Sequence, residues 1–284
     1  MTVPDGPDLV IGDYRLRLPP DHRLPAIRAA MPSYDAHLGW IIREIARDDP
    51  AGTFIDIGAN IGDTAALLRS HAPNPLLCVE GAAALLPWLR ANLRLLPGPV
   101  ACEEAFVAVA EIAAFGLNYR SGSGSGGFGL DPAAAAPARF TGVADLLAAA
   151  SRGGIPPALF KTDTDGLDGF ILRDYLRLGE DRAVLFFECD EAGTAVPGGD
   201  AAWAEVFSQL HRRGYALLIY DNHGLPMLFA DPTQGSAVDD LRFYVARQHA
   251  EGAVRIHYLD IWAFPPAKHR LFTDLRAERG RRFF

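Results

Sequence analysis

The chain has 284 residues, and its 49% hydrophobic content is enough for one large α/β domain with a full core. A formal net charge of -8 provides no basic surface for a phosphate backbone, so we expect no nucleic acid partner. No stretch approaches the roughly 20 apolar residues of a membrane span, and no basic-then-apolar leader opens the chain. We therefore expect a soluble cytoplasmic protein with no membrane partner.

The cysteines and histidines do not have the spacing of a metal site. Cys78, Cys102 and Cys189 each lie in an apolar, strand-like run without C-x-x-C spacing, and the eight histidines show no H-x-x-x-H pattern. This argues against a disulfide framework and against zinc, and predicts three reduced core cysteines. There is also no G-x-S-x-G sequence to indicate a nucleophilic serine.

The first fifty residues predict an N-terminal cap. An extended piece from Asp13 to Leu18 and a Pro-rich passage precede a helix from about Tyr34 to Asp48, whose isoleucines fall on one face.

Residues 51–265 then alternate between strand and helix patterns. In chain order we expect a strand ending near Asp56, helix Thr64 to His71, strand Pro75 to Glu80, helix Ala82 to Leu95, strand Val100 to Glu104, a further strand Ala108 to Leu117, helix Val143 to Ser151, strand Leu159 to Asp163, helix Asp168 to Leu176, strand Ala183 to Cys189, helix Ala201 to Arg213, strand Tyr215 to Tyr220, an extended piece Pro226 to Phe229, helix Val238 to Gln248 and a β-rich run Arg255 to Phe264.

This order predicts a mostly parallel sheet with covering helices. The last strand follows a hairpin-like excursion, so it is expected to pair antiparallel. The Gly/Ser-rich segment Arg120 to Gly129 is expected to form neither strand nor helix, and to act as a flexible lid over the acceptor. Residues 266–284 form a basic tail.

The sequence Phe54 to Thr64, FIDIGANIGDT, is the most informative passage. A strand that runs into a glycine-bearing turn and a helix lets backbone approach a ligand and offers unpaired N–H groups. A dinucleotide fingerprint needs glycine where Asn60 and Asp63 stand. Asp56, ahead of the turn, suits a positively charged ligand. S-adenosylmethionine (SAM) therefore fits better than a pyrophosphate.

Other strand ends carry further candidates, because ligands of open α/β sheets bind beyond the carboxyl ends of the strands. Glu80 lies about twenty residues after the glycine turn, where an acid accepts from ribose hydroxyls. Phe106, after the third strand, is either an adenine-stacking side chain or a core residue.

The passage FKTDTDGLDGF brings Lys161, Asp163 and Asp165 to one face if the strand persists, and we assign Asp168 to a helix cap. At a later strand end, His223 is either a general base or a turn residue.

A metal is not predicted, although Mg²⁺ is an alternative that this region leaves open. Its oxygen ligands would be Asp163, Glu188, Asp221 and Asn222.

The succession FIDIGANIGDT, LCVEG, FKTDTDG, LFFECD and GYALLIYDNHG resembles the FkbM family of SAM-dependent methyltransferases, over roughly Tyr34 to Phe264. The resemblance implies a seven-stranded Rossmann-like sheet with an antiparallel last strand, and methyl transfer to a hydroxyl of a sugar or secondary metabolite. It implies these cofactor contacts: Asp56, Gly58, Asn60, Gly62 and Glu80. Gly81 stands where the family usually has proline, and Asp165 where it has glutamate.

The hypothesis is therefore a SAM-dependent O-methyltransferase acting on a small hydroxyl-bearing acceptor. Asp163 or His223 would take the hydroxyl proton, and Lys161 would steady the oxyanion. Asp63 and Thr64 at the helix start, Phe106 and Asp163 complete the expected cofactor contacts. The alternatives are a nicotinamide-dependent Rossmann oxidoreductase and a non-catalytic binding module.

Overall fold

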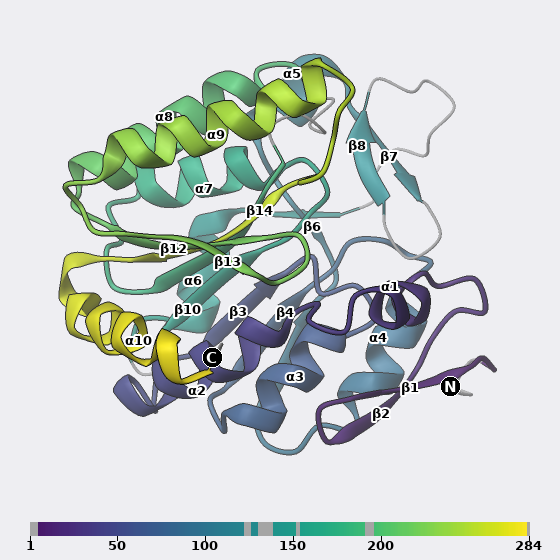
Figure 1. Cartoon of the computed structure of the whole chain (residues 1–284). Coiled ribbons are helices and arrows are strands. Elements are labelled where there is room, and N and C mark those ends of the chain that lie inside the picture. Colours follow the sequence, from purple (N-terminus) through teal and green to yellow (C-terminus); the bar gives the residue numbers. More distant parts are fainter. Residues whose placement is uncertain (1–4, 122–125, 130–138, 152–153, 191–195, 283–284) are drawn as a thin grey trace.

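The computed structural model of the chain describes residues 5–121, 126–129, 139–151, 154–190 and 196–282. Its centre is a sheet of eight strands (Figure 1). In spatial order they are β5 (Val100–Glu103), β4 (Leu76–Val79), β3 (Phe54–Ile57), β10 (Leu159–Thr162), β11 (Val184–Cys189), β14 (Leu259–Phe264), β12 (Ala216–Asp221) and β13 (Pro226–Ala230).

The sheet is parallel from β5 to β11, and β14 lies antiparallel between β11 and β12. This confirms the expected mostly parallel sheet with an antiparallel last strand. The strand count differs by one, because Pro226–Ala230 folds back on β12 as an antiparallel edge strand. A proline at the first position of an edge strand costs no ladder hydrogen bond.

Helices cover both faces of the sheet (Figure 1). One face carries α2 (Ala36–Asp48), α3 (Asp63–His71), α4 (Leu86–Leu93) and α10 (His269–Arg282). The other carries α6 (Val143–Ala150), α7 (Asp168–Arg177), α8 (Gly199–Arg212) and α9 (Gly235–Ala250). Most of these helices begin and end within a few residues of the expected positions.

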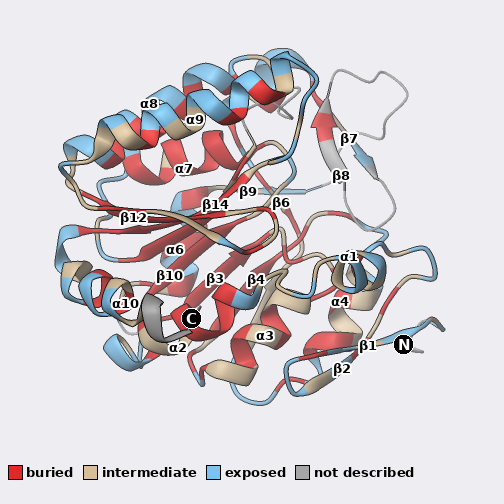
Figure 2. Ribbon diagram, in the orientation of Figure 1, coloured by how far each residue is buried: buried red, intermediate tan, exposed pale blue. Residues whose placement is uncertain are grey.

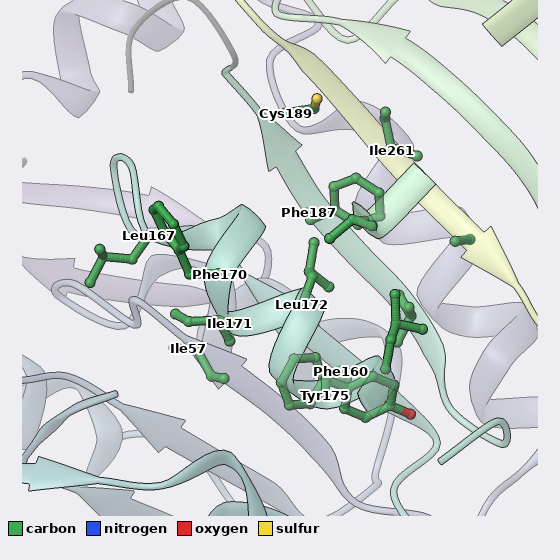
Figure 3. Close-up of a cluster of buried hydrophobic side chains, with 14 of the residues drawn as sticks. Ile57, Phe160, Leu167, Phe170, Ile171, Leu172, Tyr175, Phe187, Cys189 and Ile261 are labelled. Carbon is green, nitrogen blue, oxygen red and sulfur yellow. The ribbon is translucent and has the colours of Figure 1, made fainter. Parts of the chain in front are cut away.

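Two cores separate the sheet from these helix layers, because successive strand residues point to opposite faces. Figure 3 shows part of the core under α7, where Ile57, Phe160 and Phe187 of three strands meet Leu172 of the helix. Their immediate neighbours Leu159 and Phe186 point to the α2 face instead. The strands between the two edge strands β5 and β13 are almost entirely buried along both faces (Figure 2), as their continuous apolar runs require.

The N-terminal segment packs beside α3 and α4. It contains β1 (Asp8–Ile11), β2 (Tyr14–Arg17) and α1 (Leu24–Ala30), of which only β2 was expected. Asn92 fastens β2 to α4: its amide accepts from Arg17 N–H and donates to Arg17 C=O, both at 2.9 Å.

Residues 269–282 of the expected basic tail form α10. Its apolar residues Leu271, Phe272 and Leu275 are buried in the core that α2 also covers. At its start, Lys268 Nζ lies 2.6 Å from Asp48 Oδ2 at the end of α2. Cap, central sheet and C-terminal helix therefore share one core.

Two local predictions were wrong. The expected strand Ala108 to Leu117 is the helix α5 (Ala110–Phe115), because its alanines favour helix and Gly116, at φ +59°, ends it. The Gly/Ser-rich segment was expected to form no strand, yet β7 (Asn118–Ser121) and β8 (Gly126–Gly129) pair antiparallel. Residues 122–125 lie outside the described residues.

Aromatic packing explains why this hairpin forms. Tyr119 and Phe128 stand opposite each other across it, and both rings contact Phe106 of β6 (Phe106–Val107), which pairs with β9 (Phe140–Thr141). Cross-strand aromatic pairs stabilise a hairpin that glycine and serine alone would not.

The three cysteines are free, as expected, with Cys78 and Cys189 buried and Cys102 half-buried. Within the described part of the chain, no helix combines the length and the apolar character needed to cross a membrane.

Candidate functional site

The turn between β3 and α3 brings backbone close to the end of β10. Gly58, Asn60 and Gly62 all have positive φ, at +79°, +51° and +87°. A Cβ at Gly58 would lie 1.8 Å from the carbonyl oxygen of Asp163, so only glycine fits there. The N–H groups of Gly58 and Ala59 donate to the carbonyl of Val79, which fixes the turn against β4.

Glu80 closes this turn from the end of β4. Its Oε2 accepts from the Asn60 N–H at 2.9 Å, and its Oε1 accepts from the Ala82 N–H at 2.7 Å. Burial raises the pKa of Glu80, although these hydrogen bonds act in the opposite direction. Each carboxylate oxygen retains acceptor capacity, so a buried acceptor faces the adjoining space.

That space is a cavity, here called the Glu80 cavity. It lies between the β3–α3 turn, Glu80, Asp163 and the rings of Phe106, Tyr119 and Phe128. A Cβ on Gly81 would lie 2.3 Å from the Phe106 ring. Glycine at position 81 therefore makes room for Phe106, which lies in the cavity wall rather than in the deep core.

Lys161 is the buried cation of the site. Its Nζ lies 2.8 Å from Asp56 Oδ1 and 3.2 Å from Asp163 Oδ2. The Lys161 and Asp56 side chains are 2% and 1% exposed, whereas Asp163 is 40% exposed. Burial alone lowers the pKa of Lys161, but the two carboxylates outweigh it and raise the pKa. Lys161 therefore stays protonated and holds Asp163 in place.

The strand register places further polar groups on the same face as Lys161. Asp56 is the direct partner of Lys161, and Glu188 is the direct partner of Asp260 on β14. His37 of α2 approaches from above, with Nε2 3.3 Å from Asp260 Oδ2. These groups gather where the α2 face meets the carboxyl ends of the parallel strands.

A second cavity opens beside them, here called the Tyr258 cavity. Its walls are Tyr34, Asp63, Thr64, Asp163, Glu188 and Tyr258. The outer part has a volume of about 260 Å³ and reaches His22 and Arg23. The inner part, of about 30 Å³, reaches Asp35, Lys161 and Asp260. Asp163 lines both this cavity and the Glu80 cavity.

The carboxyl groups of the Tyr258 cavity perturb one another. The pKa of Glu188 is raised well above its ordinary value by burial and then by the charges of Asp163 and Asp260. Burial likewise raises the pKa of Asp35, with Asp260 as the next cause. The pKa of Asp63 is raised by burial in spite of the charge of Lys161.

Asp168 was predicted as a helix cap, but it is the first residue of α7, after Leu167. Its carboxylate accepts from Thr162 Oγ1 at 2.7 Å and from the Thr164 N–H at 3.1 Å. Burial raises its pKa to about 6. The side chain therefore fastens the β10–α7 loop that carries Asp163. Asp165, with φ +52°, leaves the strand direction in this loop and lines both cavities.

The structure brings most of the predicted site residues together. Those that line one or both cavities are Gly58, Asn60, Asp63, Thr64, Glu80, Phe106, Lys161 and Asp163. Asp56 and Gly62 lie outside the walls that the described residues form. Asp56 acts there through Lys161, and the positive φ of Gly62 starts α3.

His223 stands apart, in the turn between β12 and β13. Asp221 Oδ1 accepts from the N–H groups of His223 and Leu225, and Asn222 Oδ1 accepts from His257 N–H. The His223 ring lines neither cavity as the described residues define them. This position agrees with the second of the two roles that the sequence left open for His223, that of a turn residue.

The same turn weakens the Mg²⁺ alternative, because Asp221 Oδ1 and Asn222 Oδ1 already accept hydrogen bonds from backbone N–H groups. In the described residues no three His, Cys, Asp or Glu side chains are grouped so that they could hold a metal ion.

Several wall residues were not predicted. Tyr34 and Asp35 precede α2, Tyr258 precedes β14, and Tyr119 and Phe128 come from the hairpin. Of these, only Tyr258 could have been found from the sequence. It directly precedes the last strand, whose antiparallel direction was expected, and such a strand begins at the edge of the sheet where the parallel strands end.

No protein-family model matches the sequence, and the comparison with curated proteins finds no relative. Among solved structures, the chain is similar to the O-methyltransferase TomG from Streptomyces achromogenes, involved in tomaymycin synthesis, in complex with SAM, at 13% identity over 81% of this chain and 80% of that one, with a TM-score of 0.45.

Two more solved structures are an O-methyltransferase from Bacillus cereus in complex with SAH and a putative O-methyltransferase from Klebsiella pneumoniae. The first has 11% identity, covers 85% of this chain and 88% of that chain, and has a TM-score of 0.45. The second has 14% identity, covers 87% and 91%, and has a TM-score of 0.42. At such identities the function has to be inferred from the residues of this chain.

Proposed function

We propose that the chain is a SAM-dependent methyltransferase of the FkbM type, which methylates a hydroxyl oxygen of a small molecule such as a sugar or secondary metabolite. The observation that carries this proposal is the position of Asp163. It lines the Glu80 cavity, which has nucleoside-binding chemistry, and the Tyr258 cavity, which is open to a second ligand. One carboxylate therefore lies where the two ligands would meet.

The residues of the Glu80 cavity fit the adenosyl part of SAM. Glu80 supplies a buried acceptor for ribose hydroxyls, and Phe106 supplies an aromatic face for adenine. Gly58 allows backbone to approach the ligand, and Asp63 at the start of α3 lies toward the Tyr258 cavity. The acids around Lys161 suit a ligand that carries an ammonium and a sulfonium.

The Glu80 cavity is narrow, at about 60 Å³, well below the range of about 300–1,000 Å³ for ligand pockets. Tyr119 and Phe128 of the β7–β8 hairpin form part of its wall. We propose that this hairpin moves outward when the adenosyl group enters, which differs from the predicted lid over the acceptor.

When bound, SAM supplies an electrophilic methyl group. Asp163 accepts the proton of the attacking hydroxyl, since its partly exposed carboxylate faces the Tyr258 cavity. Lys161 orients that carboxylate from below, and Asp56 holds Lys161. Lys161 is thus a positioning residue in the first place, and its charge also favours a developing oxyanion nearby.

The two alternatives make different predictions. A nicotinamide-dependent oxidoreductase would use Glu80 in the same way, but its pyrophosphate would face a turn in which Asn60 and Asp63 replace glycines. A non-catalytic binding module has no use for the buried Lys161–Asp56 pair, whose burial is costly.

Calorimetric titration with SAM, with its demethylated product S-adenosylhomocysteine (SAH) and with NAD tests the proposal. We expect saturable binding of SAM and SAH, and NAD binding at least a hundredfold weaker. Preferential binding of NAD would replace the proposal by the oxidoreductase, and no binding of the three would support the module.

A further inference from the structure

The Tyr258 cavity is rich in negative charge. Six carboxylates line its outer and inner parts: Asp35, Asp63, Asp163, Asp165, Glu188 and Asp260. Among the described residues, the side chains of the walls that can carry a positive charge are Lys161 at the inner end, with Arg23 and His22 at the outer end. The cavity as a whole therefore favours a cationic ligand.

Part of this negative charge has no counter-charge within the described protein. Lys161 is already shared between Asp56 and Asp163. Glu188 forms no side-chain hydrogen bond or ion pair with another described residue, although Asp260 stands directly opposite on β14. Like charges directly opposite on neighbouring strands destabilise a sheet. A protonated His37 offsets the negative charge of Asp260, and this leaves Glu188 as an unpaired carboxylate in the cavity wall.

Two phenol rings and the size of the cavity add to the selection. Tyr34 and Tyr258 line both parts of the cavity, and aromatic faces attract organic cations. The outer volume of about 260 Å³ lies just below the range of about 300–1,000 Å³ for drug-sized ligands. A single ring or the end of a chain fits such a space.

We propose that the acceptor carries a positively charged amino group, which binds between Glu188, Asp260 and the two phenol rings while its hydroxyl lies at Asp163. This inference rests on the proposed function, because it assigns the substrate class of the same site. A carboxyl group that lacks its cation responds with a raised pKa, as Glu188 does.

The rival occupant is the ammonium group of SAM itself. SAM carries two positive charges and one negative charge, so it neutralises only one carboxylate net. Glu188 and Asp260 also lie outside the walls of the Glu80 cavity that the described residues form. The acceptor is therefore the better source of the cation that binds at Glu188 and Asp260.

The test uses matched amine and alcohol probes: glucosamine with glucose, benzylamine with benzyl alcohol, and putrescine with 1,4-butanediol. Each is titrated calorimetrically into the protein with and without SAH. We expect the amine of at least one pair to bind at least about tenfold more tightly than its alcohol, because a charge-assisted hydrogen bond replaces a neutral one. Equal binding within all pairs, or no binding of any amine up to 20 mM probe, overturns the inference.

Variants separate the acceptor from the cofactor. Glu188→Gln should abolish the preference for the amine and leave the affinity for SAM within about twofold of that of the wild type. Glu188→Asp, which keeps the charge, should retain part of the amine preference. The control is Glu104→Gln. Glu104 directly follows β5 and pairs with Arg90 of α4, so this variant should keep the amine preference. If Glu188→Gln weakens SAM binding tenfold instead, the carboxylates serve the cofactor and the inference fails. If SAM and SAH do not bind at all, the proposed function fails, while the probe pairs without SAH still decide the amine preference.

Discussion

Gly58 gives the sharpest prediction of how the backbone forms the site. Replacement by alanine puts a Cβ 1.8 Å from the Asp163 carbonyl oxygen, at a φ of +79°. The left-handed conformation costs a residue with a Cβ about 1–2 kcal/mol, and the overlap adds about 1–3 kcal/mol. The loss of folding free energy should therefore be about 2–5 kcal/mol. To relieve the overlap, the turn has to move away from Asp163 by more than 1 Å.

Gly179→Ala is the matched control. Gly179 has nearly the same φ, +76°, but nothing lies within 4 Å of the Cβ position. Gly179→Ala should lose only about 1–2 kcal/mol of folding free energy, from the backbone strain, and its SAM affinity should not change. Thermal unfolding and SAM calorimetry on both variants measure the difference, and we expect Gly58→Ala to bind SAM at least about tenfold more weakly. If the two variants unfold at the same temperature and bind SAM equally, the close approach of the turn to β10 has no role.

Four further predictions follow from the charges and the hairpin. Glu188→Gln should raise the melting temperature at pH 7.5 by a few degrees and lose this gain near about pH 4, because a carboxyl whose pKa is raised by folding lowers stability only at pH values above its pKa in the unfolded chain; an equal gain at both pH values would contradict the charge explanation. Lys161→Met should cost about 3–5 kcal/mol, since it leaves a buried carboxylate unpaired, whereas Lys268→Met should cost less, because its partners Asp48 and Asp49 remain partly exposed to water; similar chemical denaturation curves would exclude this. Asp163→Asn should lower methyl transfer by about 10²–10⁴-fold at saturating SAM, with turnover near that of the wild type ruling it out as the base. Hydrogen exchange in β7 and β8 should change when SAH binds, and unchanged exchange would refute the movement of the hairpin.

The sequence predicted the parts of the site that follow a single strand. Asp163, Glu80 and the Gly58 turn directly follow buried strands, and parallel strands bring such ends to one edge of the sheet. Lys161 was predicted from its alternation with Asp163, and the register with Asp56 explains why it is buried.

The parts that were not predicted depend on pairing across the chain. The opposition of Glu188 and Asp260 requires the register of β11 with β14, which no local pattern contains. Tyr34 and Asp35 reach the site because α2 packs on that face of the sheet. The β7–β8 hairpin was missed because its stability comes from Tyr119 and Phe128, whereas its composition indicates a flexible segment.

The same limits explain why the sequence left the role of His223 open between a general base and a turn residue. Its position after a strand favours a site residue, but β12 is separated from the parallel strands by β14. Asp221 then organises a tight turn onto β13, with the Ser33 hydroxyl donating to the His223 carbonyl.

A crystal structure of the protein with SAH tests the central claim most directly. The account predicts the ribose hydroxyls at Glu80, the adenine against Phe106 and the amino acid end toward Asp163, with Tyr119 and Phe128 displaced from their present positions. SAH bound elsewhere, or bound with its adenosyl group in the Tyr258 cavity, would contradict it.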